Sequence, residues 1–332
     1  MSQTDAPNPL PRPVAPESVG AMAAPVPKPM GRFREALDSD VFYSYRNSPI
    51  TIVASIVAAV LILMAVFAPW IAPYDPFNPA SLNLMDGFTP PNSTSMMGNY
   101  YLLGTDNQGR DVLSTIMYGS RVSLFVGIMA TLFAMALGVS LGLAAGYNGG
   151  TMDAVIMRIA DIQLSFPAIL IALLIFGIAR GIIPPSEQES AAIWVLIFAI
   201  GLSNWAQFAR TVRGATMVER QKDYVSAARI MGVHPLAILV RHVLPNVMGP
   251  VLVIATIGLA LAIIEEATLS FLGVGVPPTQ PSLGTLIRIG QQFLFSGEWW
   301  ILLFPAVTLI LLALAVNLLG DWLRDALNPR LR

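Results

Sequence analysis

The feature that most limits how this chain can fold is the recurrence of long apolar stretches. A helix needs about 20 mainly apolar residues to cross the roughly 30 Å hydrocarbon core of a bilayer. Six stretches meet this requirement, at about 50–70, 122–147, 160–183, 191–209, 247–272 and 300–319. They predict an all-α protein, a polytopic bundle of six transmembrane helices.

The composition agrees with a membrane bundle and argues against other classes. Charged residues make up 12% of the 332 residues, whereas a soluble domain carries about 25%. The net charge of −1 gives no sign of nucleic-acid binding. The chain has no Cys and only two His, His234 and His242, which we expect on a cytoplasmic surface. A membrane-embedded enzyme therefore lacks a convincing catalytic set.

The distribution of basic residues predicts the orientation. With a cytoplasmic N-terminus, four of the 19 basic residues lie outside, namely Arg110, Arg121, Arg180 and Arg288. The opposite orientation would place the other fifteen outside, against the positive-inside rule. Both termini are therefore expected in the cytoplasm.

These expectations divide the chain into five parts. Eight prolines in the first 31 residues, without the apolar core of a signal peptide, predict a disordered tail. The parts are a cytoplasmic Pro-rich tail (1–46), a first transmembrane helix (47–72), an extracytoplasmic loop with a surface helix (73–120), a core of five transmembrane helices (121–320) and a cytoplasmic tail (321–332). Within the core, Gly138, Gly142 and Gly146 are four residues apart, which predicts close packing of two helices.

Residues 213–246 form an unusual segment between the fourth and fifth spans. The sequence predicts a helix from Arg213 to Ile230, a left-handed turn at Gly232, and a second helix that Pro235 begins, with His234 as its cap. Its apolar face repeats at helical spacing until Pro245 ends the helix, through Leu236, Leu239, Val240, Val243 and Leu244. The residues alone leave two roles open for this helical elbow. It either docks into a groove of another protein or rests on lipid head groups.

The stretch "SAARIMG" followed by "VLPN" resembles the EAA loop of type I ABC importer permeases. In that family, the loop forms a coupling helix that inserts into a cleft of the ATP-binding subunit. The resemblance implies ATPase coupling by Ala227, Ala228, Arg229, Gly232, Leu244 and Pro245. Ser226 stands where the motif expects Glu, which removes one charge from the contact.

Three further stretches look like the C-type permease of dipeptide, oligopeptide and nickel ABC importers. They are residues 103–124, residues 265–287 and the closing "LLGDWLRDALNPRLR", and the resemblance runs from about residue 40 to the end. In the first of them, Thr105 and Gln108 predict a capping box before a short helix on the outer membrane surface.

The resemblance implies a type I ABC importer fold and a working assembly. The chain would be a multi-pass permease of the bacterial inner membrane, forming half of the path for peptides or similar solutes. Its implied partners are a B-type permease in a heterodimer, one or two ABC ATPase subunits and an extracytoplasmic binding protein. ATP and Mg would be bound by those ATPases, because this chain has no GxxxxGK[ST] loop. No cofactor and no enzyme activity are therefore expected in this chain.

Two questions remain open at this point. A stand-alone secondary transporter or channel is the alternative function, although the middles of the spans carry few polar residues. The solute is also undetermined, since peptide, nickel chelate, opine and oligosaccharide importers share the scaffold.

Three acidic residues fall within or near the spans. Glu265 and Glu266 lie near the outer end of the fifth span, and Asp161 begins the third beside Arg158. Carboxylates inside a membrane face a partner or a cavity. We expect pairing within the bundle, with Arg158 as the partner of Asp161. The alternative is contact with the solute for the two glutamates and a gating contact for Asp161. Pro167 is expected to kink the third span.

Overall fold

The computed structural model describes residues 44–77 and 84–327. The predicted N-terminal tail lies mostly outside these residues, as does the end of the C-terminal tail. The helices are α3 (Pro49–Val66), α4 (Ala68–Ile71), α5 (Val112–Asn148), α6 (Gly150–Leu164), α7 (Ala168–Ile182), α8 (Gln188–Glu219), α9 (Asp223–Ile230), α10 (Pro235–Ile238), α11 (Leu244–Phe271), α12 (Leu283–Phe293) and α13 (Trp300–Leu327). Three short helical turns (Leu84–Asp86, Leu239–Val243 and Leu294–Ser296) and an antiparallel pair, β1 (Ser93–Thr94) and β2 (Tyr100–Tyr101), complete the described elements.

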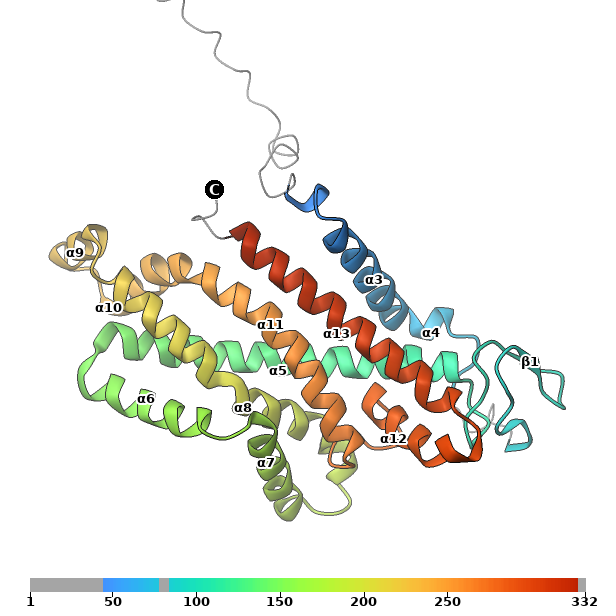
Figure 1. The fold of residues 1–332 in the computed structure, drawn as a ribbon. Helices are drawn as coiled ribbons and strands as arrows, with labels where there is room; N and C mark the ends of the chain where they lie inside the picture. The colour runs from blue at the N-terminus through green and yellow to red at the C-terminus, as the bar shows by residue number, and fades with distance from the viewer. Residues whose placement is uncertain (1–43, 78–83, 328–332) are drawn as a thin grey trace, which may run out of the picture.

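The predicted bundle of membrane-spanning helices is confirmed. Within the described residues, five helices are long and apolar enough to cross a membrane, and up to six if one bent pair counts as a single span. Figure 1 shows α5 running along the length of the molecule, with α9 and α10 at one end and the β1–β2 ribbon at the other.

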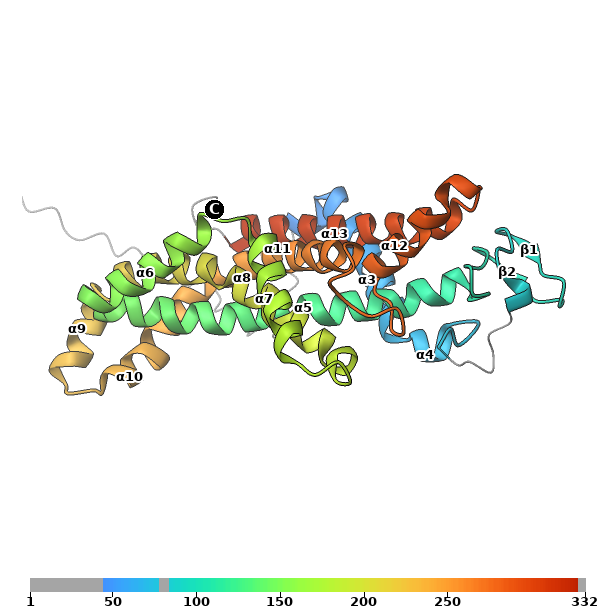
Figure 2. The same ribbon diagram turned by 90° about the horizontal axis from the view of Figure 1, so that it is seen from below.

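The third predicted span is not one straight helix, which corrects the expectation for 160–183. It consists of α6 and α7, which are bent by 97° at the break between them. Pro167 is the N-cap of α7. Proline has no N–H to donate and disfavours helical angles in the preceding residue, so α6 stops before it. Figures 1 and 2 show the two helices running in different directions.

The close packing predicted for the glycine series is confirmed, and α8 is the partner helix. A Cβ atom at Gly138 would lie 2.5 Å from the Trp205 carbonyl oxygen, and one at Gly142 would lie 2.6 Å from that of Ala209. Such distances leave room for a hydrogen atom only. The glycines therefore set how closely α5 approaches α8.

The predicted surface helix after residue 111 is wrong as a separate element. Residues from Val112 onward form the first turns of α5, which continues unbroken to Asn148. Asp111 is the cap, and its Oδ2 accepts a 2.8 Å hydrogen bond from the Ser114 N–H. Thr105 does not form the predicted capping box, because its hydroxyl donates to the Asp86 carbonyl at 2.6 Å.

The loop that precedes α5 is anchored to the bundle by buried polar contacts. Arg110 is 5% exposed and its Nε donates to Asp106 Oδ2 at 2.6 Å. Trp300 at the start of α13 donates from Nε1 to the Thr105 carbonyl at 3.0 Å. Burial opposes ionisation of Asp86, but hydrogen bonds led by that from Asn99 hold the Asp86 pKa below its ordinary value. The carboxylate therefore stays charged at neutral pH and orders the loop around it.

Candidate functional site: the elbow between two spans

The segment between α8 and α11, residues 220–243, forms the predicted elbow and lies at one end of the molecule (Figure 1). The single helix predicted from Arg213 to Ile230 is wrong, because α8 ends at Glu219 and α9 begins at Asp223. Arg220 directly follows the last residue of α8, and its Nη1 donates to the Gly146 and Tyr147 carbonyls at 2.9 and 3.0 Å. The break thus places a guanidinium on the unpaired carbonyls at the end of α5.

The turn of the elbow has the predicted conformation. Gly232 has φ of 76°, a left-handed angle that favours glycine. Its N–H donates to the Arg229 carbonyl at 3.0 Å, and the Val233 N–H donates to the Ala228 carbonyl at 3.1 Å. These two bonds make a Schellman motif that closes α9.

The second helix begins as predicted. Pro235 occupies the first turn of α10, and His234 Nδ1 accepts a 3.3 Å hydrogen bond from the Leu236 N–H. The missing N–H of the proline costs no hydrogen bond at this position, because the first N–H groups of a helix have no partner within it.

Pro245 does not end this helix, which corrects the prediction. The chain stays helical from Pro235 to Phe271, through a π-helical turn at Leu239–Val243. The Leu244 N–H reaches back to the Leu239 carbonyl, five residues earlier. The wider turn accommodates Pro245, which has no N–H to donate. The elbow is therefore continuous with the span α11.

The π turn also changes which apolar residues face inward. Leu239 and Val243 are buried, as a common apolar face requires, but Leu236 and Val240 are 64% and 61% exposed. Ile238 takes the inward place instead and is fully buried. A wider turn shifts the helical register of the residues within and after it, so the spacing of a regular α-helix misplaces Val240; Leu236 precedes this turn and is exposed for another reason.

The elbow is held to α8 and α11 by a small polar network. The Tyr224 hydroxyl donates to Glu219 Oε1 at 2.5 Å, and Lys222 Nζ lies 2.8 Å from Glu219 Oε2. Asn246 Nδ2 donates to the Tyr224 hydroxyl at 3.1 Å and to the His242 carbonyl at 2.7 Å. Burial, and then the hydrogen bond to Glu219, raise the pKa of Tyr224. The hydroxyl therefore keeps its proton at neutral pH.

A second contact joins the elbow to α5. The Arg229 guanidinium lies 4.9 Å from the centre of the Tyr147 ring, and its Nε donates to the Tyr147 hydroxyl at 3.3 Å. Together with Arg220, this contact fixes the elbow to three spans, α5, α8 and α11. A force on the elbow would therefore reach all three.

The residues predicted to couple do not share one environment. Ala227, Arg229 and Gly232 are exposed near the turn. Ala228 is 3% exposed and packs in a core cluster with Val225 and Val243. Leu244 packs partly buried against the same cluster, and Pro245 is exposed at the start of α11.

Large apolar side chains are exposed at and after the turn. Ile230 and Met231 are 88% and 75% exposed at the turn, and Leu236 and Val240 are exposed in the helical segment that follows it. We call these four side chains the tip. The sequence did not identify Ile230 and Met231, nor Tyr147, Glu219, Tyr224 and Asn246. The only local signal was the Asn that follows Leu-Pro in "VLPN".

The acidic residues in the spans all contact side chains of the bundle. Asp161 pairs with Arg210 of α8 rather than with Arg158, which corrects that prediction. The adjacent helix α8 places the Arg210 guanidinium opposite the Asp161 carboxylate. A second pair joins the same two helices, because Arg213 Nη2 donates to Asp153 Oδ2 at 2.7 Å. Glu265 accepts from Asn204 Nδ2 at 2.7 Å.

Glu266 is fully buried and accepts from the Ser270 hydroxyl at 2.8 Å. Because it is buried, a solute cannot contact Glu266 in this conformation. Glu265 is partly exposed, and the side chains of Asp161 and Arg210 are exposed.

Two family models match the sequence. The model described as binding-protein-dependent transport system inner membrane component matches residues 138–332. The model described as N-terminal TM domain of oligopeptide transport permease C matches residues 39–91.

Curated relatives match over most of their length. The dipeptide transport system permease protein of Haemophilus influenzae is 35% identical over 293 residues, which cover 88% of this chain and 95% of that protein. The oligopeptide transport system permease protein of Bacillus subtilis is 34% identical over 297 residues, covering 90% and 91%.

Among solved structures, an inward-facing conformation of the MetNI methionine ABC transporter matches with a TM-score of 0.51. At 21% identity, the match covers 64% of this chain and 96% of the other, and it supports the type I importer fold.

Proposed function

The chain belongs to the family of inner-membrane components of binding-protein-dependent transport systems, and on that premise we propose that it imports peptides and that its elbow is the contact for ATPase subunits. It is a multi-pass permease of an ABC importer in the bacterial inner membrane. The observation that carries the proposal is the apolar tip, exposed on a turn that is fixed to three spans.

The peptide class is supported by relatives that match over nearly their whole length. Both the Haemophilus and the Bacillus proteins are named as peptide permeases, and each is covered over more than nine-tenths of its length. No bulk charge in this chain favours a strongly acidic or basic solute, since the net charge is −1.

The tip is suited to a protein groove. Four large apolar side chains are exposed between residues 230 and 240, and exposed apolar surface on a soluble part of a protein marks a site of interaction. Small residues beside it, Ala227 and Gly232, let a partner backbone approach closely. Arg229 is held away by Tyr147, so the patch is not covered by its own charged neighbour.

The remaining partners are proposed from two features, the absence of a phosphate-binding loop in the sequence and a pair of charges exposed on the membrane helices. We infer a B-type permease as heterodimer partner, an extracytoplasmic binding protein, and one or two ATPases that bind ATP and Mg. The pair of Asp161 and Arg210 is more than half exposed on membrane helices. Charges at such positions face a partner or a water-filled path rather than lipid. This face is therefore where the second permease and the path would lie.

In this account, the elbow converts closure of the ATPases into movement of spans. A push on the tip acts on α11 directly, because the helix is continuous from Pro235 to Phe271. It acts on α5 and α8 through Arg220 and Tyr224. The spans would then rock between outward-open and inward-open arrangements.

Uptake measured in sealed vesicles tests the proposed function. We expect peptide uptake by the reconstituted transporter with its binding protein to require ATP, to stop with vanadate, and to persist when the proton gradient is dissipated. Uptake that continues without ATP and collapses with the proton gradient would instead support a secondary transporter. Vesicles that lack the ATPase subunits are the control.

A further inference from the structure

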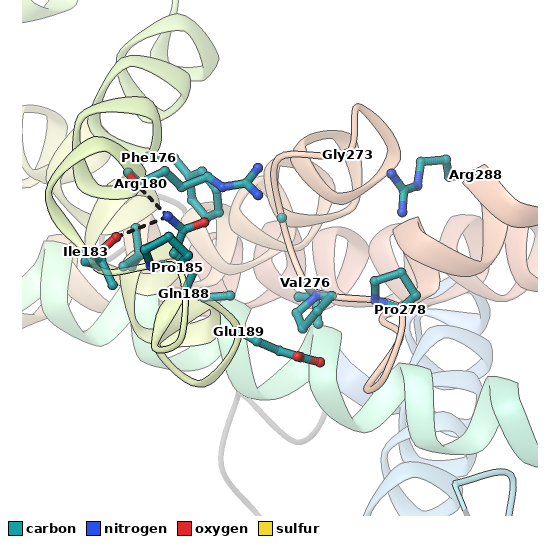
Figure 3. A pocket seen from close by; sticks show the side chains of 14 residues that line it. Phe176, Arg180, Ile183, Pro185, Gln188, Glu189, Gly273, Val276, Pro278 and Arg288 are labelled. Atoms are coloured by element: carbon teal, nitrogen blue, oxygen red, sulfur yellow. Dashed lines mark hydrogen bonds between the residues drawn. The ribbon is translucent and has the colours of Figure 1, made fainter. Parts of the chain in front are cut away.

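A cavity of about 450 Å³ lies beside the start of α8, at the opposite end of that helix from the elbow. The loop between α7 and α8 forms one side, and the loop between α11 and α12 forms the other (Figure 3). Since α8 runs 32 residues from this loop to the elbow, the two sites are roughly 48 Å apart along that helix. In the predicted orientation, the cavity opens on the outer side.

Two arginines reach into the cavity from opposite sides. Arg180 lies in the last turn of α7, and Arg288 lies on α12. Figure 3 shows their guanidinium groups pointing toward one another across the hollow. In the described part of the chain, neither guanidinium has an ion pair or a hydrogen bond. Glu189, which also lines the cavity, accepts a hydrogen bond from Thr279 instead.

The loop beneath Arg288 is shaped to let that side chain lie over it. Gly273 has φ of 82°, and a Cβ atom there would lie 2.7 Å from Arg288 Nη1. The loop is fixed by the Val276 N–H, which donates to Ser270 Oγ at 3.2 Å, and by the Thr285 hydroxyl, which donates to the Val276 carbonyl at 3.2 Å.

The opposite wall is fixed by a side-chain amide. Gln188 Nε2 donates to the Arg180 carbonyl at 3.0 Å and to the Ile183 carbonyl at 3.1 Å, which ties the end of α7 to the start of α8. Both arginines therefore project from ordered backbone.

We propose that this cavity binds a carboxylate of the transported solute, the C-terminal carboxylate of a peptide, between Arg180 and Arg288. The proposal rests on the peptide class proposed above. Guanidinium groups bind carboxylates through paired, charge-assisted hydrogen bonds. The volume falls in the range of small-molecule sites, about 300–1,000 Å³. Phe176, Ile183 and Val195 give the cavity apolar walls that suit the rest of a peptide.

An acidic residue of the binding protein is the competing source of a carboxylate. Docking between proteins buries a broad surface, about 800 Å² on each partner. The arginines instead line a hollow, and Arg288 is only partly exposed. This geometry favours a small solute over a protein surface.

Two peptides that differ only at the C-terminus test the proposal. Uptake of trialanine and of trialanine amide is measured in vesicles holding the complete transporter, its binding protein and ATP. In the variants Arg180→Gln and Arg288→Gln, we expect the KM for trialanine to rise roughly 10- to 100-fold, the range of one lost charge-assisted hydrogen bond. The KM for the amide should change less than about two-fold, since the amide lacks the charge that the arginines bind.

Matched variants separate this result from loss of structure. Arg121→Gln removes an outer charge that does not line the cavity, and it should leave both KM values unchanged. Arg180→Lys and Arg288→Lys keep the charge without the paired geometry, so they should raise the KM for trialanine selectively but less. The difference between the two peptides in the lysine variants therefore tests the proposal even if a glutamine variant is not inserted in the membrane.

Two results would overturn the proposal. An equal loss for both peptides, with a higher half-saturating concentration of binding protein, would assign the arginines to receptor docking. Unchanged kinetics in both arginine variants would leave the cavity without a role in binding.

Direct binding of the two peptides to the purified transporter, without binding protein, separates this proposal from the proposed function. Preference for trialanine that is lost in Arg288→Gln supports the cavity even if uptake proves independent of ATP. Equal binding of both peptides by the wild type contradicts the cavity, even where ATP-driven uptake is intact.

Discussion

A leucine in place of Gly142 should prevent the bundle from assembling. The Cβ atom alone would lie 2.6 Å from the Ala209 carbonyl oxygen and 2.8 Å from Val212 Cβ. Both atoms belong to α8, and Val212 is fully buried. The helices would have to separate, and overpacking of this kind costs about 1–3 kcal/mol or more. We expect at least a ten-fold loss of chain from the membrane, measured by quantitative immunoblot.

Gly214 on α8 provides the matched control for this prediction. It is exposed, and among the residues that the structure describes a Cβ atom there would meet nothing within 4 Å. Gly214→Leu should therefore accumulate as the wild type does. Normal amounts of Gly142→Leu in the membrane would show that α5 and α8 do not pack as closely as described here.

A valine in place of Gly232 should uncouple ATP hydrolysis from uptake while the chain remains inserted. The φ of 76° is left-handed, and a β-branched residue held in such a conformation costs about 1–3 kcal/mol. Opening the Schellman motif would relieve this strain, and it would move α10 relative to α9. We expect uptake to fall at least ten-fold while ATPase activity of the assembled transporter persists.

Gly232→Asn separates backbone conformation from steric bulk. Asparagine adopts left-handed angles more readily than other residues with a side chain, and no atom of the described residues lies within 4 Å of a Cβ atom at this position. The asparagine variant should therefore keep most of the uptake. Undiminished uptake in Gly232→Val would contradict the role given to the turn.

Features governed by local rules were predictable from the sequence. Span lengths follow from the thickness of a bilayer, and the turn follows from Gly232 and Pro235, whose backbone preferences hold in any context. The glycine series also predicted close helix packing, although it did not identify α8 as the partner.

Features set by distant contacts were not predictable. Pro167 indicated a kink, but the 97° bend depends on how α6 and α7 pack. The partner of Asp161 lies 49 residues away, and Arg220 reaches carbonyls more than 70 residues away. The apolar pattern after residue 111 suits either a surface helix or the start of α5. The π turn depends on how the chain accommodates Pro245, and it places Val240 on the exposed face.

We expect the tip of the elbow to be held by an ATPase subunit during transport. The natural chain has no Cys, so Met231→Cys carries a single thiol on the tip, and Ile56→Cys on the exposed face of α3 is the control. A photoreactive group on each thiol is activated in membranes during ATP turnover. We predict that the group at residue 231 joins the ATPase subunit and that the group at residue 56 does not. Labelling of phospholipid alone from residue 231 throughout turnover would contradict the account.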